Sequence, residues 1–171
     1  TYDVMTDSPV DYLSGSMTTA NNAGNYCTFN PNDIITSTGT ISNGNLSWSS
    51  SAGNFGNRGT LGSKSGKWYW EAVGTNTRNG TVGGRFAFTG DDTTAIESDK
   101  FGMNWHPTSG VQRIVNGTIT AVDASATYVD GDVLGLALDL DNNISYWYKN
   151  GTLASTYDFS SYRSEEHTSE L

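Results

Sequence analysis

The clearest hydrophobic pattern in the chain lies in "GDVLGLALDLDNNISYWYKNG", residues 131–151. Its leucines alternate with small or polar residues, which is typical of a strand with one apolar face; they are Leu134, Leu136, Leu138 and Leu140. The polar run "DLDNN" then predicts a turn, and "ISYWYK" predicts the returning strand. Two faces of the returning strand compete for the core, Ile144/Tyr146/Tyr148 and Ser145/Trp147/Lys149, and simple periodicity favours the first.

Four Asn-Gly pairs occur along the chain, the last of them at the end of the stretch 131–151. This dipeptide tolerates the positive φ of a type I′ turn, so each pair predicts a tight hairpin. The pairs are Asn43-Gly44, Asn79-Gly80, Asn116-Gly117 and Asn150-Gly151. The clearest hairpin is "VQRIVNGTITAV", residues 111–122, where two β-branched runs flank the turn.

Three further stretches are strand-like: "NYCTFNP", which we expect to end at Pro31, "GKWYWEAVG" (residues 66–74) and "GRFAFTG" (residues 84–90). No run of ten or more residues has helical periodicity without glycine, so helix should be minor. The pattern predicts an all-β fold, an antiparallel two-sheet sandwich over residues 25–162. Residues 1–24 have no periodicity and suggest a leader or linker.

Composition narrows the classes of function. A length of 171 residues suits one domain. The formal net charge is −9 and the cationic residues are scattered, so we expect no nucleic-acid and no membrane partner. Cys27 is the only cysteine, which excludes a disulfide within the chain and a cysteine-based metal site. No run of 18 apolar residues exists to span a membrane.

Candidate chemistry is sparse. A glycoside hydrolase needs two carboxylates across the scissile bond, and the Glu-x-Asp-x-x-Glu strand that would supply them is absent. His106, in "NWHPTSG", is more typical of a surface loop than of a catalytic triad, and nothing local supports a dyad with Cys27. Asp139, Asp141 and Asn143 resemble the start of a calcium loop. That loop lacks its glycine and its final glutamate, so a hairpin turn explains these residues better. We therefore expect no enzyme, no cofactor and no metal.

Two motifs together resemble the SPRY domain, a concanavalin-like β-sandwich. The first is Tyr69-Trp70-Glu71. The second begins with "GDVLG" at residues 131–135 and ends with "WYKNG" at residues 147–151, and the resemblance covers about residues 25–153. It implies that Trp147, not Tyr146, faces the core. With the strand patterns it predicts Trp70, Leu136 and Leu138 in one buried core. The Phe-Pro and Asn-Phe-Gly strands of the family do not follow Leu153, so we expect the sandwich to lack its last one or two strands.

The resemblance implies a protein-recognition module with a ligand surface built from loops. The candidate loops are Asn76–Arg85, Trp105–Arg113 and Ala124–Asp130, and the candidate binding residues are Arg78, Trp105, Arg113 and Tyr128. The alternative is a lectin-like domain on the same fold, so the expected partner is a protein or a glycan. The leader is similar to segments that precede SPRY domains in predicted phage and marine-metagenome proteins, which implies a place in a virion or tail structural protein.

The last nine residues, "RSEEHTSEL" at 163–171, match codon by codon the translation of a sequencing-library adapter. We therefore expect residues 163–171 to be an artefact that follows a natural chain cut short. Without this tail, His106 is the only histidine. Such a segment should be exposed and irregular, because it carries one leucine among polar residues.

Overall fold

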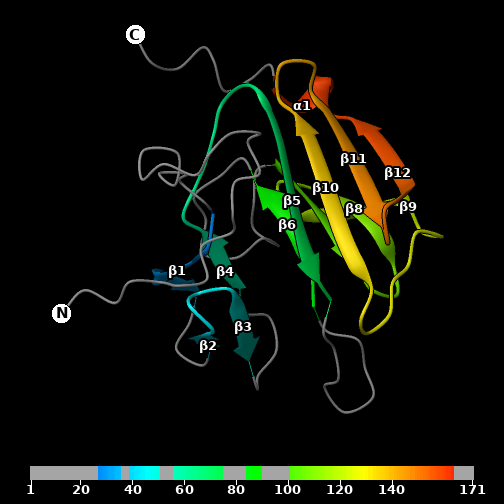
Figure 1. Ribbon diagram of the computed structural model, residues 1–171. Coiled ribbons are helices and arrows are strands. Elements are labelled where there is room, and N and C mark those ends of the chain that lie inside the picture. The colour runs from blue at the N-terminus through cyan, green and yellow to red at the C-terminus, as the bar shows by residue number, and fades with distance from the viewer. Residues whose placement is uncertain (1–26, 36–38, 51–55, 75–83, 90–100, 164–171) are drawn as a thin grey trace, which may run out of the picture. The chain divides into compact units, whose positions relative to one another are not determined.

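The computed structural model describes residues 27–35, 39–50, 56–74, 84–89 and 101–163 (Figure 1). Within these ranges the regular structure is twelve strands, all paired antiparallel, and one four-residue helix, α1 (Ser160–Arg163). The chain folds as two compact units, Thr1–Gly62 and Ser63–Leu171. The prediction of an all-β antiparallel sandwich is confirmed.

The first unit contains two short ribbons. β1 (Phe29–Ile35) pairs with β4 (Gly56–Gly59), and β2 (Gly39–Ser42) pairs with β3 (Ser47–Ser50). The turn between β2 and β3 has positive φ at Asn43 (54°), Gly44 (61°) and Asn45 (65°). Glycine and asparagine tolerate these angles best, so the hairpin predicted from Asn43-Gly44 is confirmed.

The prediction that a strand ends at Pro31 is wrong, because β1 continues through it to Ile35. Proline has no N–H to donate, and the register between β1 and β4 is irregular at this point. The side chain of Asn57 on β4 bridges the irregularity: its Oδ1 accepts from the Asn30 N–H at 2.9 Å and its Nδ2 donates to the Asn30 carbonyl at 2.8 Å. A side-chain amide thus replaces part of the backbone ladder.

The second unit contains the sandwich. One sheet has the order β12-β11-β10-β5, from β5 (Lys67–Val73), β10 (Val133–Asp139), β11 (Ile144–Lys149) and β12 (Thr152–Asp158). The other has the order β6-β7-β8-β9, from β6 (Phe86–Thr89), β7 (Phe101–His106), β8 (Gly110–Val115) and β9 (Thr118–Asp123). Each sheet is antiparallel throughout, and Figure 1 shows the sheet of β5, β10, β11 and β12 in front of the other.

Asn-Gly turns connect two pairs of these strands. Asn116-Gly117 joins β8 to β9 and Asn150-Gly151 joins β11 to β12, with positive φ at all four residues. Both predicted hairpins are therefore confirmed. The fourth pair, Asn79-Gly80, lies outside the described residues.

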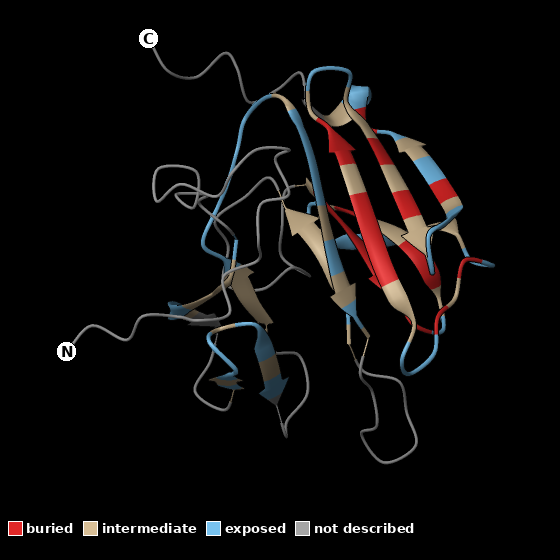
Figure 2. Ribbon diagram, in the orientation of Figure 1, coloured by how far each residue is buried: buried red, intermediate tan, exposed pale blue. Residues whose placement is uncertain are grey.

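The core lies between the two sheets (Figure 2). Leu136 on β10 pairs with Trp147 on β11, and both side chains are fully buried. Trp147 therefore faces the core, as the SPRY resemblance implied and simple periodicity did not. Leu138 is also buried as predicted, whereas Trp70 on the edge strand β5 is only partly buried and packs against the core from its side.

The chain beyond α1 and the leader before Cys27 lie outside the described residues, so the predictions for residues 1–24 and 164–171 stay predictions. Of the predicted artefact, the structure describes Arg163 as the last residue of α1. In the described ranges, no helix is both long enough and apolar enough to cross a membrane.

Candidate functional site

The four predicted binding residues differ in how far the structure buries them. Arg78 lies outside the described residues. Trp105 on β7 is 0% exposed and Tyr128 is 3% exposed, with their rings 5.9 Å apart in an edge-to-face contact. The expectation that these two aromatic residues are exposed on loops is therefore wrong, and both belong to the core. Arg113 on β8 is half-buried and keeps part of its side chain accessible.

The loop at residues 124–130 folds inward, which explains this burial. The indole N–H of Trp105 donates to the carbonyl of Ala126, and the hydroxyl of Tyr128 donates to the carbonyl of Gly84. The backbone N–H of Tyr128 donates to the Pro107 carbonyl at 3.1 Å. Both aromatic tips have partners, so their burial leaves no donor unpaired. Burial also raises the pKa of Tyr128 above its usual range.

His106 and Glu71 each accept hydrogen bonds from nearby residues. Nδ1 of His106 accepts from the backbone N–H groups of Ser109 at 3.2 Å and Thr108 at 3.3 Å, and so caps the turn between β7 and β8. On the outer surface of β5, the hydroxyl of Tyr69 donates a hydrogen bond of 2.5 Å to the Glu71 carboxylate. Cys27 is exposed in the first unit, outside the unit that holds His106.

The residues that resembled a calcium loop form a hairpin turn, as predicted. Asp139 accepts from the backbone N–H of Asn142 at 3.1 Å, from its side-chain amide at 2.9 Å and from Lys67 at 2.9 Å. Asp141 accepts from the Gly66 N–H at 2.8 Å. The hydrogen bonds from Asn142, followed by that from Lys67, lower the pKa of Asp139 to about 2. Among the described residues, no group of three or more His, Cys, Asp or Glu could hold a metal ion.

The sheet β12-β11-β10-β5 has an outward surface that the sequence analysis did not single out. Leu136 and Trp147 point into the core, so their neighbours on β10 and β11 point outward. Cross-strand pairing aligns these outward residues in rows. We call this surface the tyrosine face; it consists of Tyr69, Glu71, Gly135, Ala137, Tyr146, Tyr148 and Leu153.

The centre of the tyrosine face is built around Gly135. Its cross-strand neighbours are Glu71 on β5 and Tyr148 on β11. A Cβ atom at residue 135 would lie 2.6 Å from the Tyr69 hydroxyl and 3.3 Å from the Tyr148 Cβ, so only glycine lets the Tyr69 tip lie over β10. The rings of Tyr69 and Tyr148 meet edge to face at 6.4 Å. Glycine thus creates the space in which the two rings come together.

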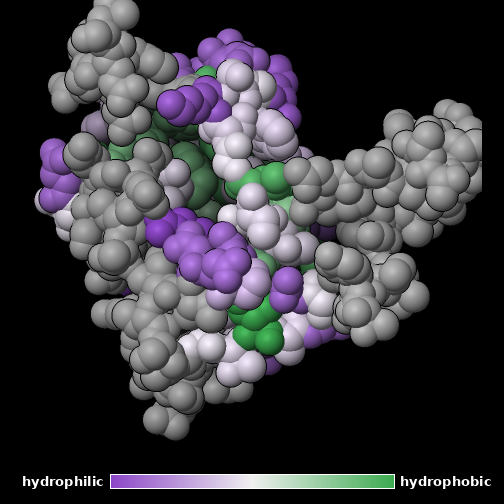
Figure 3. Space-filling view, turned by 90° about the vertical axis from the view of Figure 1, so that its left-hand side faces the viewer, coloured by the Kyte–Doolittle hydropathy of each residue, from purple (hydrophilic) through white to green (hydrophobic). Residues whose placement is uncertain are grey.

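Tyr69 is 56% exposed although it is held by Tyr148 and Glu71. The hydrogen bond to Glu71 is the main cause that raises the pKa of Tyr69 to about 12. Leu153 on β12, the cross-strand neighbour of Tyr148, is also exposed. The tyrosine face therefore offers apolar contact area and one carboxylate on regular strands. In the view of Figure 3, hydrophobic residues reach the surface as separate patches between polar ones.

A second cluster surrounds Arg113, and we call it the arginine cluster. Arg113 Nη1 donates to the hydroxyl of Tyr157 on β12 at 3.2 Å and to the hydroxyl of Tyr162 in α1. The guanidinium carbon lies 5.2 Å from the centre of the Tyr162 ring, which stacks on Phe101 at 5.4 Å with an interplanar angle of 7°. Of the predicted binding residues that the structure describes, Arg113 alone is partly accessible.

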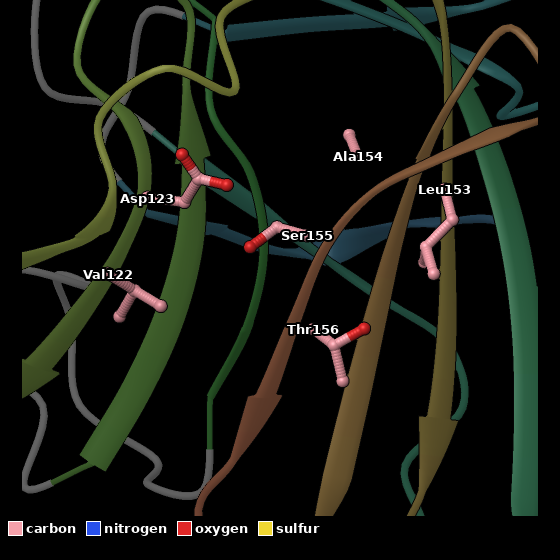
Figure 4. A pocket seen from close by; sticks show the side chains of 6 residues that line it. All are labelled: Val122, Asp123, Leu153, Ala154, Ser155 and Thr156. Atoms are coloured by element: carbon pink, nitrogen blue, oxygen red, sulfur yellow. The ribbon is translucent and has the colours of Figure 1, made fainter.

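A shallow pocket opens between the edge strands β9 and β12 (Figure 4). It is lined by Val122 and Asp123 on one side and by residues 153–156 on the other. Asp123 and Ser155 point toward each other across it (Figure 4). The hydroxyl of Ser125 donates to Asp123 at 2.7 Å and is the main cause that lowers the pKa of that carboxyl. Asp123 mainly fixes its own loop, so we assign the pocket no chemistry.

No protein-family model matches this chain, and no curated protein matches it.

Proposed function

We propose that this chain is a non-catalytic recognition module that binds a protein ligand on the tyrosine face. The exposure of Tyr69 beside Tyr148 and Leu153 carries the proposal. Tyrosine is enriched in binding hot spots because it offers a large contact area at small entropic cost. Strands held in a four-stranded sheet add little further ordering cost on binding.

The SPRY resemblance supports the same class of function, with a different surface in use. Its implied binding loops supplied Trp105 and Tyr128, which are buried here. We therefore propose the outer surface of the sheet rather than those loops. The similarity of the leader to phage and metagenomic proteins supports a role in a virion or tail structural protein.

A display library of protein fragments, selected against the immobilised chain, tests the proposal. The face variant Tyr69→Ser/Leu153→Ser removes two exposed side chains of the tyrosine face, so the fold should persist. The matched control variant is Ile119→Ser/Val129→Ser, which also removes two exposed apolar side chains but from β9 and the loop after Tyr128. We expect the selected ligands to bind the control variant as they bind the wild type, and not to bind the face variant. Ligands that bind the face variant but not the control variant would contradict the proposal.

A lectin-like function is the second candidate, because Glu71 lies beside the exposed Tyr69 ring. The apolar side of a sugar ring packs on aromatic rings, and a carboxylate accepts hydrogen bonds from sugar hydroxyls. A glycan array separates the candidates. Glycan binding that the face variant abolishes, without any protein binder on that face, would favour the lectin.

A further inference from the structure

We propose that Arg113 and the hydroxyls of Tyr157 and Tyr162 form a binding site for a carboxylate group of a partner. The site lies apart from the tyrosine face, on the core side of β8 at the end of the sandwich near α1. Its basis is the set of hydrogen-bond donors that the cluster leaves open. The inference does not depend on the proposed use of the tyrosine face.

The guanidinium group is engaged on one side only. Both hydrogen bonds to the tyrosine hydroxyls come from Nη1 of Arg113, which leaves the edge formed by Nε and Nη2. Within the described part of the chain, neither of these two nitrogens has a hydrogen-bond partner. Among the described residues, the fully buried side-chain polar atoms without a partner belong to Trp48, Asn104 and Gln112, so neither nitrogen of Arg113 is one of them. The Nε/Nη2 edge of Arg113 is therefore neither fully buried nor hydrogen-bonded to the described residues.

The chain shows what such an edge binds when it is filled. In the first unit, Arg58 Nε donates to Asp33 Oδ2 at 2.6 Å, and Arg58 Nη2 donates to Asp33 Oδ1 at 2.9 Å. This parallel pair of bonds is the bidentate geometry that arginine and carboxylate favour. Arg113 presents the same edge, and the described residues place no carboxylate on it.

The two tyrosines make the cluster selective for an anion. Because Arg113 donates to both hydroxyls, each hydroxyl oxygen accepts there and keeps its own proton to donate. The cluster thus offers a positive charge and donors from three side chains. The Tyr162 ring beneath the guanidinium, itself stacked on Phe101, holds the fork in place. A planar carboxylate fits the fork and carries the charge that complements the guanidinium, which a neutral or cationic ligand does not.

NMR of the arginine Nε–Hε signals tests the site on the intact chain, with acetate as the probe and chloride to match ionic strength. We expect a saturable shift of the Arg113 signal with acetate. The Arg58 signal is an internal control and should not move, because Asp33 already fills its edge. No shift at Arg113, or an equal shift at both arginines, would overturn the proposal.

Variants and a second anion sharpen the test. Arg113→Lys keeps the charge but loses the fork, and should weaken acetate binding about tenfold or more, since bonds to charged groups are the stronger class. Tyr157→Phe keeps the ring and removes one donor, so a smaller loss of about threefold is expected if the fold is unchanged. Wild-type affinity in both variants would overturn the site. Inorganic phosphate that binds more tightly than acetate would overturn the assignment to a carboxylate.

Discussion

Replacement of Trp147 by alanine tests the arrangement of the core most severely. Trp147 is fully buried at the centre of the sandwich. Its ring contacts those of Trp105 at 6.0 Å, Phe88 at 6.1 Å and Phe86 at 6.5 Å, all from the opposite sheet. Its indole N–H donates to the Ser145 hydroxyl at 3.1 Å. Trp147→Ala would therefore remove three of the ring contacts between the two sheets.

The expected loss of stability follows from the buried area. A fully buried tryptophan covers about 200 Å² of mostly apolar surface, worth about 5 kcal/mol at roughly 25 cal/mol per Å². Partial collapse of the cavity reduces this figure, so we expect Trp147→Ala to lower the free energy of unfolding by about 3–5 kcal/mol. Domains of this kind are stable by roughly 5–15 kcal/mol, so the loss is a large part of the total.

Urea unfolding followed by far-ultraviolet circular dichroism measures this loss. Trp68→Ala is the control, because Trp68 has the same chemistry but is 44% exposed on the edge strand β5. Trp68→Ala should lower the free energy of unfolding by about 1 kcal/mol or less. The partly buried Trp70 should fall between the two when replaced by alanine. If Trp147→Ala and Trp68→Ala shift the urea midpoint equally, the assignment of Trp147 to the core is refuted.

Two further predictions concern a turn and a titration. Gly110→Ala should cost about 3 kcal/mol or more in urea unfolding, because Gly110 has φ +72° and a Cβ there would lie 1.9 Å from the Asp123 carbonyl oxygen. Gly62→Ala, whose Cβ would meet nothing within 4 Å, is the control, and equal costs would contradict the account. By ¹³Cζ NMR, Tyr69 should titrate at a pKa of about 12, and Glu71→Gln should return it toward 10.0. Because the fold favours the protonated phenol, the stability from this bond is complete below pH 10 and is lost as the pH rises to about 12. An unchanged Tyr69 titration in Glu71→Gln would exclude the hydrogen bond as its cause.

Local patterns in the sequence predicted several of the strands and turns that the structure describes, but not β4 or β7. Alternation in β10 predicted the burial of Leu136 and Leu138, and Asn-Gly predicted three hairpins, at Asn43, Asn116 and Asn150. These features depend on the φ preferences of single residues and on the two-residue period of a strand.

Contacts between segments that are distant in the sequence explain which features were not predicted correctly. Trp105 and Tyr128 were expected on the binding surface, but residues 124–130 turn inward through hydrogen bonds to Pro107 and Gly84. Because these partners are distant in the sequence, local patterns do not show the contacts. The tyrosine face depends on register, since Gly135 meets Glu71 only through the pairing of β10 with β5. The "GLALD" run contained a hint, because glycine and alanine on the outward phase of a central strand leave space for aromatic neighbours.

Hydroxyl-radical footprinting of the chain with a ligand from the display selection shows whether the tyrosine face is the recognition surface. It compares the oxidation of individual exposed side chains in the free and the bound state. We expect Tyr69, Tyr148 and Leu153 to become protected in the bound state, while Ile119 on β9 and Val129 keep their reactivity. Protection of Ile119 and Val129, with Tyr69 and Leu153 unchanged, would contradict the claim that the tyrosine face is the recognition surface.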